Sequence, residues 1–113
     1  MNVYTIQFAV PATIKTGPEF IKWFKTVVDS STFEALAAQV TEEQSGDNLT
    51  FYKRWIPQPG VVEIVKGFNT KTNAAASLKK TKELYSSAIA KPVFSTVSSK
   101  NDEELAKIES VAI

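Results

Sequence analysis

The chain has 113 residues, of which 43% are hydrophobic and 22% are charged, a composition that fits one globular domain. Its 13 basic and 12 acidic side chains leave a formal charge of +1, so the overall charge gives no attraction to nucleic acid or to an anionic membrane. Apolar runs are short, and the first residues lack the basic end and apolar run of a signal peptide. We therefore expect a soluble, cytoplasmic protein with no nucleic-acid or membrane partner.

The sequence contains neither cysteine nor histidine. This excludes Ser-His-Asp and Cys-His nucleophiles, zinc sites built on thiolate or imidazole, and haem held by histidine. The acidic groups at 42–47 and 102–104 lack the alternating spacing of a calcium-binding loop. We therefore predict no metal site and no cofactor, and we expect any activity to survive treatment with a chelator.

The first half of the chain predicts one strand followed by two helices. Apolar and mixed side chains alternate over 3–10, as in a strand with one buried face. A capping box at Thr16 predicts a helix start, and a second one at Ser31 predicts another, shorter helix before a polar loop at 41–48. The first helix has a broad apolar stripe formed by Phe20, Trp23, Phe24, Val27 and Val28.

The stretch 49–68 is the densest block of β-branched and aromatic residues, and 57–60 (Pro-Gln-Pro-Gly) interrupts it. This pattern predicts two strands joined by a turn. If all four residues form the loop, Arg54 lies opposite Glu63. Side chains alternate along a strand, so Tyr52 is then expected on the same face as this ion pair.

Helix formers over 73–90 predict a further helix after the hairpin. It carries three lysines within 79–82, which we interpret as its solvated side and not as a phosphate site. The short β-branched stretch 93–98 predicts a fourth strand. A capping box at the start of 101–112 predicts a C-terminal helix.

The element order β-α-(α)-β-β-α-β-(α) predicts one ferredoxin-like α+β domain over 1–113, with helices on one face of a four-stranded antiparallel sheet. Right-handed crossovers give the strand order fourth, first, third, second. The helix-covered face is expected to carry Tyr4, Ile6, Phe8, Phe51, Trp55, Val62, Ile64 and Phe68. The uncovered face is expected to carry Thr5, Gln7, Tyr52, Arg54, Glu63 and Val65.

This layout, with an extra helix after the first, a proline-bearing hairpin and a trailing helix, resembles the dimeric α+β-barrel superfamily. That group includes the antibiotic-biosynthesis-monooxygenase-like proteins. The resemblance implies a homodimer with a small ligand between sheet and helices. Cofactor-free oxygenases of the group use Asn, Trp and Arg, which Asn48, Trp55 and Arg54 supply here, whereas the histidine of haem-degrading relatives is missing.

Two functional hypotheses follow. The first is a small-molecule-binding protein, with cofactor-independent monooxygenase-like activity on an aromatic or polyketide-like substrate. Its catalytic candidates are Arg54, Glu63 and Tyr52, and its ligand-binding candidates are Gln7, Trp55 and Asn48. The alternative is a non-catalytic interaction or regulatory module that uses the open sheet face and the C-terminal helix. A structural reading of Arg54 and Glu63 is a cross-strand ion pair that sets register and contributes about 0.2–1 kcal/mol.

The uncovered sheet face would expose Val3, Val61 and Val65, a patch that monomers rarely leave open. We therefore expect a homodimer through the open faces, with an isologous interface. The alternative is that the C-terminal helix folds over the sheet and covers these valines itself.

Overall fold

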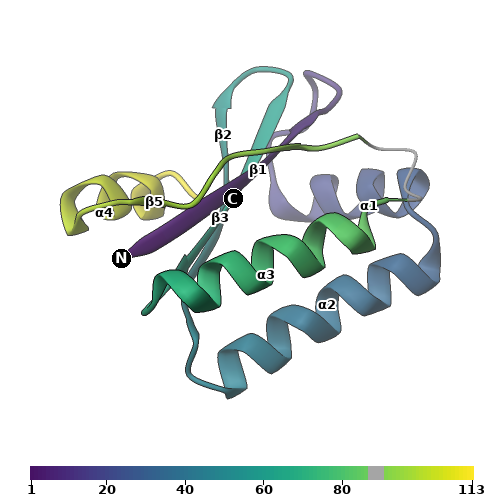
Figure 1. Ribbon diagram of the computed structural model, residues 1–113. Coiled ribbons are helices and arrows are strands. Elements are labelled where there is room, and N and C mark those ends of the chain that lie inside the picture. Colours follow the sequence, from purple (N-terminus) through teal and green to yellow (C-terminus); the bar gives the residue numbers. More distant parts are fainter. Residues whose placement is uncertain (87–90) are drawn as a thin grey trace.

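The computed structural model describes residues 1–86 and 91–113. Its elements are β1 (Asn2–Ala9), α1 (Gly17–Val27), α2 (Ser30–Ser45), β2 (Leu49–Gln58), β3 (Val61–Phe68), α3 (Lys71–Leu84), β4 (Val93–Phe94), β5 (Ser98–Ser99) and α4 (Asp102–Ser110). The strands form one antiparallel sheet in the order β2-β3-β1-β4, and β5 also pairs with β1 (Figure 1). The predicted ferredoxin-like α+β fold and strand order are confirmed.

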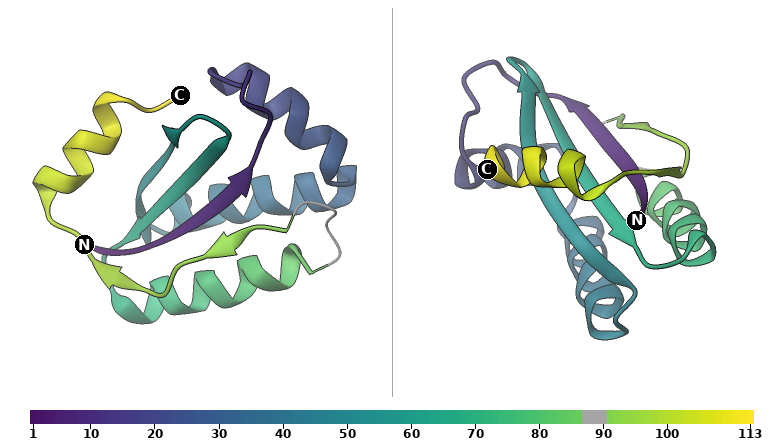
Figure 2. Two further views of the ribbon diagram at one scale, coloured as in Figure 1. Left: turned by 90° about the horizontal axis from the view of Figure 1, so that it is seen from above. Right: turned by 90° about the vertical axis from the view of Figure 1, so that its left-hand side faces the viewer.

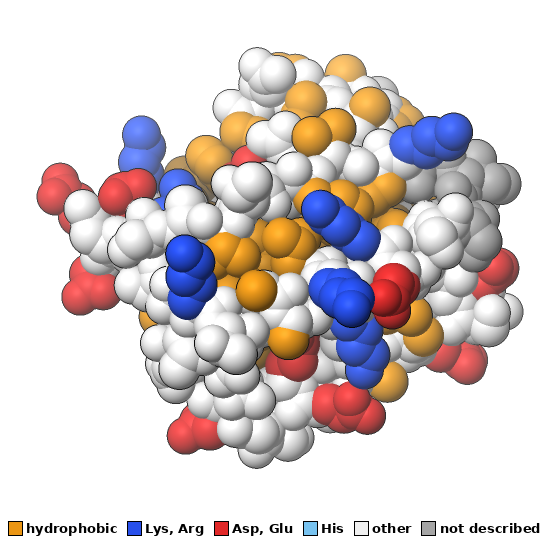
Figure 3. Space-filling model, viewed as in Figure 1, with side chains coloured by type: hydrophobic (Ala, Val, Ile, Leu, Met, Phe, Trp, Pro, Cys, Tyr) orange, Lys and Arg blue, Asp and Glu red, His pale blue; other side chains and the backbone are white. Residues whose placement is uncertain are grey.

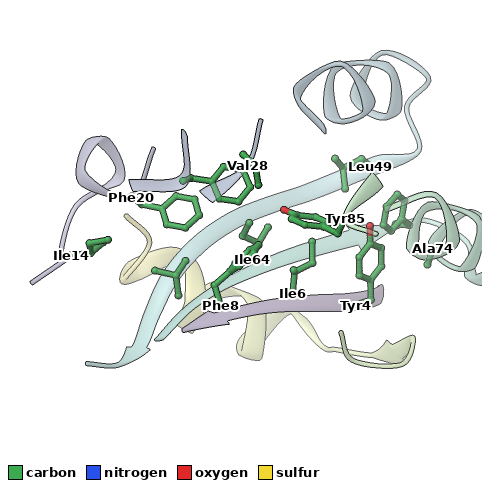
Figure 4. Close-up of a cluster of buried hydrophobic side chains, with 13 residues drawn as sticks. Tyr4, Ile6, Phe8, Ile14, Phe20, Val28, Leu49, Ile64, Ala74 and Tyr85 are labelled. Carbon is green, nitrogen blue, oxygen red and sulfur yellow. The ribbon is translucent and has the colours of Figure 1, made fainter. Parts of the chain in front are cut away.

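The main core lies between the sheet and helices α1, α2 and α3. Alternate residues of β1 point toward these helices, as Figure 4 shows for Tyr4, Ile6 and Phe8. The ring of Phe8 lies edge-on to that of Phe24, with centroids 5.5 Å apart, and Phe24 stacks on Phe20 at 5.3 Å. The inward-facing side chains of β1 therefore pack against the apolar stripe of α1, as predicted.

Helix α4 covers the opposite face of the sheet. Figure 2 shows it crossing the strands on the side away from the other helices. Its Leu105 and Ile108 pack on Val3 and Val65, both of which are 0% exposed. The expected open valine patch is therefore wrong, because the C-terminal helix buries these two side chains within the chain; Val61 is half-buried.

The hairpin register differs from the prediction by one residue. Arg54 pairs with Ile64 and Trp55 pairs with Glu63, so the expected Arg54–Glu63 pairing is wrong. Because side chains alternate, a one-residue slip moves every side chain of β2 to the other face. Tyr52 and Arg54 therefore face the main core, whereas Trp55 faces α4.

A bulge near the end of β2 causes this shift. The strand continues to Gln58, which pairs with Val61, and the register changes between Trp55 and Gln58. Only two residues remain for the turn, and its Gly60 adopts a φ of 86°, a conformation that favours glycine. Pro57 has no N–H to donate to a ladder, so it is suited to a bulge.

Two predicted helix starts are confirmed by their caps. Thr16 Oγ1 accepts a hydrogen bond from the Glu19 N–H at 3.3 Å, at the start of α1. Asn101 Oδ1 accepts from the Glu104 N–H at 2.9 Å, and the Glu104 carboxylate accepts in return from the Asn101 N–H. These motifs act within one turn of helix, so the sequence alone specifies them.

Other boundaries differ from the predictions. Asp29, and not Ser31, caps α2, and its Oδ1 accepts from the Thr32 N–H at 2.6 Å. The helix continues to Ser45, so most of the expected loop at 41–48 is helical. The expected fourth strand is broken into β4 and β5. The helix before it ends at Leu84 with Tyr85 as its C-cap, earlier than predicted, and positions 87–90 of that prediction lie outside the described residues.

Candidate functional site

A cavity of about 260 Å³ lies between the sheet and helices α1, α2 and α3. Most of its lining is apolar or aromatic: Ile6, Phe20, Ile21, Phe24, Phe33, Leu36, Ala37, Val40 and Ile64. Its polar lining residues are Gln39, Tyr52, Arg54, Lys66, Thr81 and Tyr85. The bulge in β2 is what brings Tyr52 and Arg54 into this cavity, because it turns them toward the helices.

The Arg54 guanidinium lies beside the beginning of α1. Its Cζ is 5.4 Å from the centre of the Phe20 ring, within the range of a cation–π contact. A Cβ atom at Gly17 would lie 3.1 Å from Arg54 Nη2, so a glycine here leaves room for the guanidinium. Arg54 takes part in none of the ion pairs between described residues.

Lys66 is a buried cation at the edge of the same cavity. Only 2% of its surface is exposed, because it follows Ile64 in the alternation of β3 and so points toward the helices. Its Nζ donates to Glu43 Oε1 at 2.7 Å and to Ser77 Oγ at 3.3 Å. No role in a site was predicted for this residue from the sequence, although a lysine at an inward strand position was a usable signal.

Further hydrogen bonds join α2, α3 and β1 around this lysine. The Tyr4 hydroxyl lies 2.7 Å from Ser77 Oγ and 2.9 Å from Thr81 Oγ1. Gln39 Nε2 donates to Thr81 Oγ1 at 3.0 Å. Within the described part of the chain, no fully buried side-chain nitrogen or oxygen lacks a partner. This network therefore forms a satisfied polar wall of the cavity.

Two tyrosines add neutral hydroxyls to the lining. Burial raises the pKa of Tyr52 and that of Tyr85, so both phenols stay protonated at neutral pH. Neither hydroxyl forms a hydrogen bond with a described residue, and no such bond contributes to either pKa. Figure 4 shows Tyr85 lying over Ile6, on the helix side of the sheet.

The remaining predicted site residues of the sheet lie on the other face. Glu63 accepts hydrogen bonds from Gln7 Nε2 at 2.7 Å and from Trp55 Nε1 at 3.0 Å. The structure thus brings Gln7, Trp55 and Glu63 together, and it separates them from Tyr52 and Arg54. The expected pocket that combined Gln7 and Glu63 with Tyr52 and Arg54 is not formed.

Asn48 lies outside the cavity, in the connection between α2 and β2. Its Oδ1 accepts a hydrogen bond from Asn73 Nδ2 at 3.1 Å, which ties this connection to α3. It also lines a smaller hollow of about 170 Å³ on the far side of the polar network. Its position is that of a structural contact between elements.

Charged side chains on the helical side are of both signs. Figure 3 shows basic groups over α2 and α3 with acidic groups beside them. Lys80 Nζ, for example, lies 3.6 Å from Glu42 Oε2. Within residues 1–86 and 91–113, no group of three or more potential ligands could hold a metal ion, and no helix could cross a membrane.

No protein-family model matches the chain, and no curated protein matches it. One similar solved structure is a dimeric ferredoxin-like protein from an uncultured marine organism, with 11% identity and a TM-score of 0.44 over 88% of this chain and 95% of that chain. A likeness at this level says nothing about activity or assembly. Membership of the antibiotic-biosynthesis-monooxygenase-like group stays a prediction.

Proposed function

We propose that the chain binds a small, mostly aromatic molecule in the cavity between the sheet and helices α1, α2 and α3. The observation that carries this proposal is the apolar lining of a cavity of about 260 Å³. An apolar cavity of about 150 Å³ already binds benzene, so this one suits a ligand of one or two rings. The few polar groups of the lining would orient the ligand, as in other small-molecule sites.

Two neighbouring alanines of α2 provide a matched test. Ala37 and Ala38 are both exposed, but only Ala37 lines the cavity. We expect Ala37→Trp to weaken the binding of indole by at least about tenfold, because the new side chain occupies the ligand's space. Ala38→Trp should leave binding unchanged. Isothermal titration calorimetry measures both, and equal affinity in the two variants would contradict the proposal.

Cofactor-independent oxidation of the bound molecule by molecular oxygen, with the substrate itself supplying the electrons, is the reaction that we propose for this site. The support is that Arg54 and Tyr52, which are catalytic candidates from the sequence, line the cavity. Glu63 lies on the opposite face, so it could not contact a ligand there. Oxygen uptake in the presence of a bound aromatic substrate measures this activity, and its absence would leave a binding protein.

The expected homodimer and cytoplasmic location stay predictions. A dimer could not use Val3 and Val65 while α4 covers them, so its interface would involve other surface. The alternative function, a protein-interaction module, could still use the outer surface of α4, but it could not use Val3 and Val65 of the sheet while α4 packs on them. Light scattering would show twice the mass of the chain for a dimer.

A further inference from the structure

The unpartnered polar groups of the cavity share one property, which is that each can donate a hydrogen bond. Arg54 offers the N–H groups of a guanidinium that has no carboxylate partner among the described residues. Tyr52 and Tyr85 offer hydroxyls that no described residue engages. A guanidinium has no acceptor at all, so a ligand that satisfies it must itself provide acceptors.

The charges around the cavity favour an anion. Its lining includes no carboxylate, and of its two cations only Arg54 lacks a counter-ion among the described residues. The charge of the Lys66 ammonium is already balanced by Glu43, so Arg54 supplies the positive charge that remains for a ligand.

From these contacts we infer that the ligand is an aromatic carboxylate, with its anionic group held by Arg54. Tyr52, which lies two residues before Arg54 on the same face of β2, donates a further hydrogen bond to the carboxylate, and the ring lies among the apolar side chains beside Phe20. Paired donors on a guanidinium match the two oxygens of a carboxylate, which gives geometric as well as electrostatic selectivity. This inference rests on the proposed function, because it specifies the ligand of the same cavity.

Two probes of nearly the same shape separate this inference from the proposed function. Indole-3-carboxylate carries the charge, and indole-3-carboxamide does not. We expect calorimetry to show the carboxylate binding about 10- to 100-fold more tightly to the wild-type protein, since a hydrogen bond to a charged group is stronger than one to a neutral group. Added salt should weaken the carboxylate more than the amide.

A pair of variants assigns this preference to Arg54. Arg54→Gln should abolish the preference for the carboxylate, and Arg54→Lys should retain part of it. Lys53→Gln is the matched control. Lys53 precedes Arg54 in β2 and points to the other face of the sheet, where its Nζ lies 3.7 Å from Glu109 Oε1. The substitution removes the same charge, and it should leave the preference intact. The thermal unfolding of each variant shows whether it is folded.

The possible outcomes distinguish the two ideas. If the amide binds wild-type protein as tightly as the carboxylate, the inference is wrong and the proposed function stands. If neither compound binds, the inference is wrong, and the proposed function is wrong as well if indole also fails to bind. If the carboxylate is preferred but Lys53→Gln removes the preference as fully as Arg54→Gln, the selectivity comes from overall charge, and the assignment to Arg54 is overturned.

Discussion

The buried position of Lys66 requires hydrogen-bond acceptors and a counter-ion from the elements packed around it. Strand alternation directs this lysine into the protein, where its ammonium must be paired, because an isolated buried charge is strongly unfavourable. Oε1 of Glu43 in α2 lies 2.7 Å from Lys66 Nζ and supplies the counter-ion, and Ser77 Oγ in α3 is a second acceptor. A single inward-pointing lysine thus links the sheet to two helices.

Two adjacent glutamates test this role. Glu43→Ala should lower the free energy of unfolding by up to about 3–5 kcal/mol, because it leaves the buried Lys66 without its counter-ion. Glu42→Ala removes an exposed ion pair with Lys80, and it should lower stability by about 1 kcal/mol or less. Urea denaturation measures both. Similar decreases in the free energy of unfolding in the two variants would show that the buried ion pair stabilises the fold no more than the exposed one.

At the scale of elements, α4 acts as a cover for the sheet. Its side chains Leu105 and Ile108 are 5% and 6% exposed, against valines that would otherwise face solvent. The backbone after the helix continues this contact, since the Ile113 N–H donates to the Arg54 carbonyl at 2.8 Å. The helix is therefore part of the folded core and not an appendage.

Truncating α4 side chains tests this account. Ile108→Ala should lower the free energy of unfolding by about 2–5 kcal/mol, because it leaves a cavity over Val3 and Val65. Val111→Ala, at a position that is 52% exposed, should change it by no more than about 0.5 kcal/mol. Thermal or urea unfolding compares the two. An equally small effect at Ile108 would mean that α4 is not packed as described.

The hairpin marks the limit of what local sequence patterns could predict. The strands, their order and the caps at Thr16 and Asn101 follow from periodicity and short motifs, which act over a few residues. The register of β2 depends on a bulge beside Pro57, and turn residues alone do not distinguish a four-residue loop from a two-residue turn after a bulge. This shift of the register by one residue determines which face of the sheet carries Arg54.

On the scale of the whole molecule, the sheet separates two environments. One face encloses the aromatic core and the cavity with Tyr52 and Arg54, and the other carries α4 and the hydrogen-bonded group around Glu63. The cavity could not be predicted from the sequence, because it is the space left between three helices and a sheet after all their side chains pack. Its polar residues come from elements far apart in the chain.

A ligand could bind on either face of the sheet. Chemical-shift mapping of the backbone amides with indole-3-carboxylate shows on which face it binds. We expect the largest changes at residues around the cavity, such as Ile21, Ala37 and Arg54, with little change at Gln7 or Glu63. Changes centred on Gln7 and Glu63, or no saturable changes at all, would contradict the central claim that the cavity between the sheet and the helices is the binding site.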